Sequence, residues 1–61
     1  MEEFFNVKYN GKVYDFKLTE DGTIWFKDEI GAWTNANQVK PCKNLKDAKQ
    51  NAYDMLKSAG K

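Results

Sequence analysis

The sequence contains no histidine, no arginine and a single cysteine, Cys42. Without a histidine, the Cys42 thiol lacks the usual general base, and one thiol can form neither a disulfide within the chain nor a zinc site. The glycines are isolated from one another, so no glycine-rich phosphate loop is present. We therefore expect a protein that is not an enzyme and that uses no metal, cofactor or small-molecule substrate.

The missing arginine also narrows the class of partner. All ten basic residues are lysine, whereas bidentate contacts to phosphate groups and to guanine are typical of arginine. A dedicated reader of duplex DNA is therefore disfavoured. Lysine without arginine is also typical of an A+T-rich genome, which fits a small phage-encoded protein.

Long apolar runs are absent as well. None approaches the roughly 20 residues that span a bilayer, and the start, Met1-Glu2-Glu3, lacks the basic segment that opens a signal peptide. A lone cysteine is more common in a reducing compartment than in secreted proteins. We expect an intact cytoplasmic protein with no membrane partner.

What is present indicates one small globular domain covering residues 1–61. Hydrophobic residues make up 41% and aromatic residues 15% of the chain, which is globular rather than disordered composition. The formal net charge is only +1, but residues 1–37 are net acidic and residues 38–61 are net basic. Small net charge gives no generic attraction to nucleic acid.

Two turns predict three strands. Asn10-Gly11 is typical of a type I′ turn between strands at 4–9 and 12–18, and its two-residue loop pairs Phe5 with Phe16. Thr19–Gly22 predicts a second turn into a strand at 23–28, which pairs Phe16 with Phe26. A break at Asp28–Gly31 returns the chain as a short fourth strand at 32–36.

A C-terminal helix is predicted over residues 45–59. Asn44 is suited to the N-cap position, and the apolar residues recur at helical spacing. These residues are Leu45, Ala48, Ala52, Met55, Leu56 and Ala59. The predicted fold class is α+β, a three- or four-stranded antiparallel meander sheet with the helix packed on one face. We expect the helix to cover the face that carries Phe16, Ile24 and Phe26.

The opposite face of the sheet has nothing predicted to cover it. By the same register it carries Phe4, Asn6, Lys8, Val13, Asp15, Lys17, Thr23, Trp25 and Lys27. Grouped exposed aromatic residues usually mark a binding surface, which places Trp25 at its centre with Trp33 nearby. Alternatively, Trp33 and residues 29–40 fold over Trp25 and make a second small core, and the lysines serve only solubility.

The helix offers another candidate surface. Lys46, Lys49, Tyr53 and Lys57 fall on one flank at helical spacing. Such a flank can follow a phosphate backbone or an acidic protein surface. The simpler interpretation is a solvated helix face with ion pairs three and four residues apart.

Two functions remain open. The first is a non-enzymatic protein-binding module, a small inhibitor, antitoxin-like or adaptor protein, which docks through the open sheet face. Its partner-binding residues would be Trp25, Phe4, Lys8, Lys17, Lys27 and Trp33, with Trp25 as the main anchor. The alternative is a nucleic-acid-binding domain that uses the same face and the lysine flank. An exposed edge strand also leaves a homodimer open.

Overall fold

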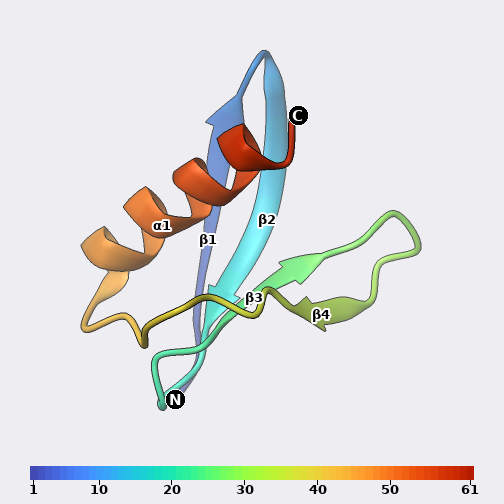
Figure 1. Cartoon of the computed structure of the whole chain (residues 1–61). Helices are drawn as coiled ribbons and strands as arrows, with labels where there is room; N and C mark the ends of the chain where they lie inside the picture. Colours follow the sequence, from blue (N-terminus) through green and yellow to red (C-terminus); the bar gives the residue numbers. More distant parts are fainter.

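The computed structural model describes residues 1–61 as a four-stranded sheet and one helix (Figure 1). The elements are β1 (Glu3–Tyr9), β2 (Lys12–Leu18), β3 (Ile24–Lys27), β4 (Trp33–Asn35) and α1 (Leu45–Ser58). The strands follow the order β1-β2-β3-β4 with every pair antiparallel. The predicted meander with one C-terminal helix is confirmed, although β3 and β4 are each shorter than predicted.

The first hairpin has the predicted turn and register. Asn10 and Gly11 have φ angles of 54° and 80°, and both central residues of a type I′ turn need positive φ. Tyr9 lies opposite Lys12 and Phe5 opposite Phe16. The turn therefore decides which side chains point toward the helix and which point away.

Gly22 lies where the second turn meets the loop that leads to α1. A Cβ at Gly22 would lie 2.8 Å from the Cys42 carbonyl oxygen, and the φ angle of 85° also favours glycine. The Gly22 carbonyl accepts hydrogen bonds from the Cys42 amide at 2.9 Å and from Gln38 Nε2 at 2.6 Å. The Ile24 amide in turn donates to Gln38 Oε1 at 2.8 Å. The loop is thus fastened to the start of β3.

The core lies between α1 and the paired strands. Asn44 caps the helix, with its Oδ1 accepting from the Asp47 amide at 2.9 Å. The buried side chains are Phe5, Phe16, Leu18, Ile24, Ala48, Ala52 and Leu56. α1 packs chiefly on β1 and β2. At 14 residues and with many charged side chains, it is too short and too polar to cross a membrane.

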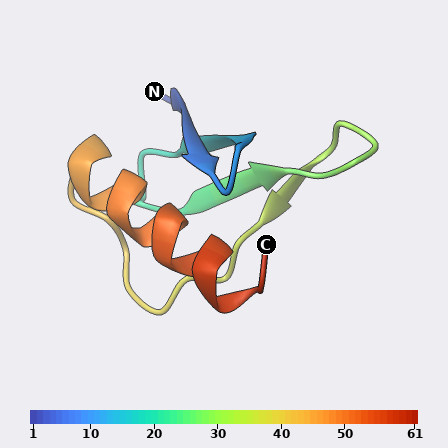
Figure 2. The same cartoon turned by 90° about the horizontal axis from the view of Figure 1, so that it is seen from above.

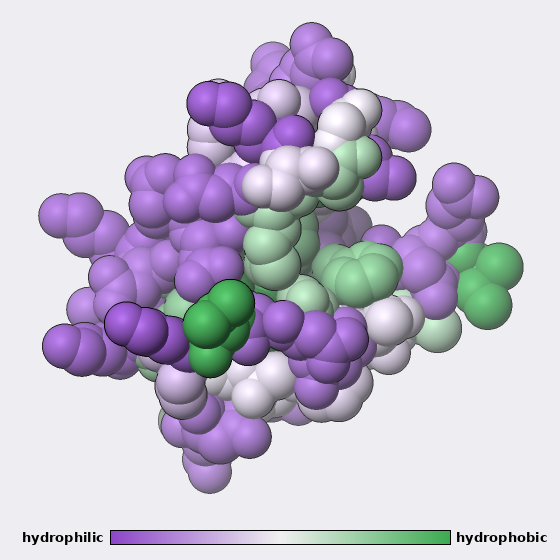
Figure 3. All heavy atoms as spheres, viewed as in Figure 1, coloured by the Kyte–Doolittle hydropathy of each residue, from purple (hydrophilic) through white to green (hydrophobic).

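One core prediction is wrong, because Phe26 is not covered by the helix. Phe26 is 36% exposed, and Figure 2 shows the loop end of the β3–β4 hairpin projecting away from α1. Sheet twist rotates each strand relative to the last, so a helix aligned with β1 and β2 leaves the far strands uncovered. Figure 3 shows pale green atoms in the hollow between the helix and this hairpin.

Candidate interaction surface

The face of the sheet away from α1 carries a row of side chains across all four strands. Phe4 lies opposite Lys17, Lys17 opposite Trp25, and Trp25 opposite Asn35. Directly opposed residues share a face, so these pairs confirm the predicted placement of Phe4 and Trp25. The pairing of Lys27 with Trp33 then brings Trp33 onto the same face.

Three aromatic side chains on this open face gather around Lys17. We call Phe4, Trp25 and Trp33 the aromatic cluster. The Phe4 and Trp33 ring centroids are 5.9 Å apart. Phe4 is 63% exposed, whereas Trp25 and Trp33 are half-buried. The cluster therefore presents one exposed ring beside two rings that are held partly within the surface.

The ammonium group of Lys17 lies within this cluster and interacts with its aromatic rings. Its Nζ lies 5.1 Å from the Trp33 ring centroid and 5.8 Å from that of Trp25, distances at which an indole attracts a cation. Nζ also donates to Glu2 Oε2 at 3.2 Å, and the Lys17 side chain is only 14% exposed. Lys17 thus acts as the centre of the cluster, with its charge matched inside the molecule.

The exposure of Trp25 lies between the two predictions made from the sequence, namely a Trp25 exposed on an open face and a Trp25 buried in a second small core. It is half-buried, and its Nε1 is enclosed without a hydrogen-bond partner, so the indole offers carbon atoms rather than its N–H to a partner. Residues 29–40 do not close a second core over it. Apart from Trp33, the large apolar residues of that segment are Ile30 and Val39, which are 90% and 95% exposed.

The remaining predicted residues of the open face lie on either side of the cluster. Lys27 Nζ lies 5.6 Å from the Trp33 ring centroid, so this exposed lysine lies at the edge of the cluster. Lys8 lies opposite Val13 near the first turn. Both are exposed, Val13 by 59%. The structure therefore groups five of the six predicted partner-binding residues and leaves Lys8 at the far end of the sheet.

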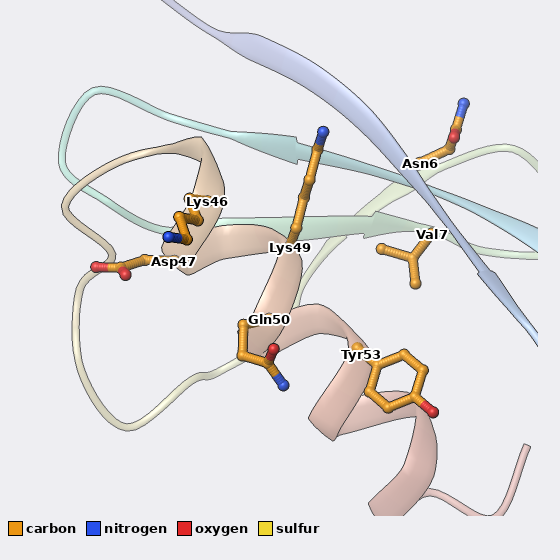
Figure 4. Close-up of a pocket in the computed structure, with 7 residues that line it drawn as sticks. All are labelled: Asn6, Val7, Lys46, Asp47, Lys49, Gln50 and Tyr53. Carbon is orange, nitrogen blue, oxygen red and sulfur yellow. The ribbon is translucent and has the colours of Figure 1, made fainter.

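The predicted helix flank divides in two. Lys46, Lys49 and Tyr53 line a groove of about 550 Å³ between α1 and β1, whereas Lys57 lies outside it. Figure 4 shows this α1–β1 groove, with Lys49 extending from the helix toward β1. The Tyr53 ring packs edge-on against Tyr9, with centroids 5.2 Å apart. None of the three flank lysines makes an ion pair.

The sequence did not indicate a second groove, which lies between the C-terminal half of α1 and the β3–β4 hairpin. Its volume is about 1030 Å³, and Tyr14, Phe26 and Met55 contribute apolar surface to it. Charged residues of both signs surround them, so the lining favours neither an acidic nor a basic ligand. The alternation of apolar and polar residues in β3 predicts that the helix covers Phe26, so the sequence pattern gives no sign of this groove. The groove results from the twist of the sheet, which is a property of the three-dimensional structure.

Cys42 is a packing residue in this structure. Its Sγ accepts a weak hydrogen bond from Gln38 Nε2 at 3.6 Å. Burial, more than the nearby Asp47 charge, raises the pKa of the thiol. A raised pKa keeps the thiol protonated and less nucleophilic. No cluster of three or more potential metal-binding side chains is present.

Comparison with protein-family models, with curated proteins and with solved structures finds no match to this chain. No function is therefore carried over from a relative. The functional argument rests on the surfaces described above, of which the aromatic cluster is the most distinctive.

Proposed function

We propose that this chain is a non-enzymatic protein-binding module that docks through the open face of its sheet, with the aromatic cluster as the anchor. The observation that carries the proposal is the enclosure of Lys17 between Trp25 and Trp33 with Glu2 as its ion-pair partner. Because that charge is already matched, the centre of the face is apolar and close to neutral. Depletion of charge and enrichment in aromatic residues are typical of the centre of a protein interface.

The shape of the cluster also favours docking. Phe4 is the most exposed aromatic residue on this face, so we assign the role of the inserted side chain to Phe4 rather than to Trp25, which the sequence favoured. Trp25 and Trp33, both half-buried, form the surface beneath. Rings already packed against each other lose little conformational freedom on binding. Lys8 and Lys27 then form a polar rim that sets orientation. A chain of this kind would act by occupying a partner's surface, as an inhibitor, an antitoxin-like protein or an adaptor does.

Nucleic-acid binding by the same face is the weaker alternative. Lys17 would have to leave Glu2 and the two indoles to reach a phosphate group, and Lys27 lies against Trp33. Asp15 is exposed on the same side, where it would repel a phosphate backbone. Single-strand binders combine stacking with a strongly positive groove, and this face has no such excess of positive charge.

The test is affinity capture from a nuclease-treated lysate of the source cells with three baits. The first is the natural chain, the second is Phe4→Ala, and the third is Val39→Ala, which truncates an exposed apolar residue away from the open face. We expect a protein retained by the natural and Val39→Ala baits and lost from Phe4→Ala. Identical retention by all three baits, or a protein retained only from a parallel lysate without nuclease, would contradict the proposal.

A further inference from the structure

We propose that the exposed edge of β1, together with the α1–β1 groove, binds an extended acidic segment of a partner protein as an additional strand of the sheet. This surface is separate from the centre of the open face. Edge-strand addition combines main-chain hydrogen bonds, which give affinity, with pockets for alternate side chains, which give selectivity.

The backbone of β1 presents unpaired hydrogen-bonding groups along this edge. In a hairpin closed by a two-residue turn, Tyr9 and Lys12 exchange both main-chain hydrogen bonds, and bonded pairs then alternate along the strands. Phe4, Asn6 and Lys8 therefore direct their N–H and C=O groups away from β2, and all three residues are exposed.

The hydrogen bonds of the second hairpin agree with this assignment. The Thr19 amide donates to the Thr23 carbonyl at 3.0 Å, which directs the odd-numbered residues of β2 toward β3 and the even-numbered ones toward β1. β1 is seven residues long and contains no proline. The opposite edge strand, β4, has only three residues. The sheet therefore offers one long edge, and that edge adjoins the groove.

The groove supplies side-chain contacts on the helix side of that edge. Val7 points from β1 toward α1, and Tyr53 rises from the helix beside it (Figure 4). Lys46 and Lys49 continue the lining toward the start of the helix, and neither has an ion-pair partner. A strand added about 4.8 Å from β1 would place alternate side chains along this line of apolar and then basic groups.

The charge of the groove decides between an acidic segment and a second copy of this chain. A second copy paired antiparallel through β1 would bring the same lining, two lysines and one carboxylate, to the same face of the shared sheet. It would add positive charge to the interface rather than neutralise it, and electrostatic complementarity favours a partner of opposite charge. Asp47 is the only carboxylate in the lining. An acidic segment complements the two lysines instead.

The test is an amide NMR titration of the whole chain with a blocked seven-residue peptide of alternating glutamate and valine. We expect saturable shifts at the amides of Phe4, Asn6, Lys8 and Lys49. Binding should weaken as salt rises from about 50 to 300 mM, because exposed charges are screened. The same peptide with lysine in place of glutamate should not bind.

Two sets of variants separate the strand edge from the charge. Asn6→Pro removes an outward N–H without removing a β1–β2 hydrogen bond and should weaken binding at least about tenfold. Lys46→Glu with Lys49→Glu should weaken it at least about fivefold, which corresponds to the upper value for an exposed ion pair. Lys40→Glu with Lys43→Glu carries the same charge change outside the groove and should bind like the natural chain.

The proposal is overturned if no saturable shift occurs up to about 1 mM peptide, or if the shifts are confined to Trp25, Lys27 and Trp33. It also fails if the Lys46→Glu, Lys49→Glu chain binds as tightly as its control. Dimerisation with loss of the β1 edge amides would make a second copy the occupant. Tighter binding of an oligonucleotide than of the peptide in this groove would make nucleic acid the occupant.

Discussion

Lys17 is the residue that gives the open face its character. It is enclosed by two indole rings and an ion-pair partner, so its aliphatic stem packs while its charge stays matched, as long basic side chains often do. The same residue in an open position would have made the face basic. The choice between protein binding and nucleic-acid binding therefore depends strongly on the position of the Lys17 ammonium group.

Truncation of Lys17 should reveal its packing role. Lys17→Ala removes a side chain that is only 14% exposed and should lower the free energy of unfolding by about 1–2 kcal/mol, whereas Lys17→Met keeps most of the aliphatic stem and should cost less than about 1 kcal/mol. Urea denaturation measures both values. Equal losses in the two variants would show that charge rather than packing holds Lys17 in place.

Phe4 and Trp25 should differ in what they contribute to stability. Phe4 is 63% exposed, so Phe4→Ala should cost less than about 1 kcal/mol. Trp25 is half-buried, so Trp25→Ala should cost about 2 kcal/mol, below the range of a fully buried aromatic residue, and should leave the chain folded. Thermal unfolding followed by circular dichroism distinguishes the two. A larger loss for Phe4→Ala would contradict the assigned exposures.

At the scale of the elements, the residues of each turn fix which residues pair across the two strands that the turn joins. The turn from Thr19 to Gly22 is held by Asp21, whose Oδ1 accepts from Thr19 Oγ1 at 2.6 Å and from the Thr23 amide at 3.1 Å. The hydrogen bond from the Thr19 side chain is the main cause that lowers the pKa of Asp21 below its ordinary value of 3.8. The hydrogen bonds therefore favour the ionised carboxylate in the folded state.

A lowered pKa in the folded state stabilises the fold at pH values above the ordinary one, and this contribution is lost as pH falls through the depressed value. We expect Asp21→Asn to lower the free energy of unfolding at pH 7, and the difference from the natural chain to shrink as pH falls below the ordinary value of 3.8. Urea denaturation at pH 7 and on the acid side of that value measures the difference. A difference that does not change with pH would exclude the Asp21 carboxylate as its source.

Features fixed by residues close together in the sequence could be predicted, whereas features fixed by contacts between distant segments could not. Asn10-Gly11 determines the register of β1 and β2 locally, and the turn from Thr19 to Gly22 that of β2 and β3, so the open-face positions of Phe4 and Trp25 followed by counting. The exposure of Phe26 depends on sheet twist relative to the helix, which alternation does not encode. The contact of Trp33 with Lys17 and Phe4 depends on the β3–β4 register, which has no comparable turn signal. The α1–β1 groove likewise depends on where the helix settles.

At the scale of the whole molecule, stability rests on very few buried side chains. Seven residues form the core, and domains of this size rarely have more than about 3–5 kcal/mol of stability from a single core. Phe16 is 3% exposed and stacks on Phe5 with ring centroids 5.5 Å apart. Exposed positions of the open face, such as Phe4, can therefore be varied with little loss of stability, whereas the buried positions of the helix-side face cannot.

Phe16→Ala should unfold most of the population. The loss for a buried phenylalanine is about 3–5 kcal/mol, which matches or exceeds the stability expected of the domain. Amide NMR dispersion and the cooperativity of the thermal transition measure the outcome. A folded Phe16→Ala chain with a transition close to that of the natural chain would mean that the core extends beyond these seven residues.

The central claim is that the centre of the open face is apolar and close to neutral, which favours a protein partner over nucleic acid. The most direct measurement is an amide NMR titration with single- and double-stranded oligonucleotides of mixed sequence at about 50 and 200 mM salt, conditions between which phosphate contacts weaken strongly. The account predicts no salt-sensitive shifts at Lys8, Lys17, Trp25 or Lys27. Shifts that cluster on these residues and fade as salt rises would contradict it.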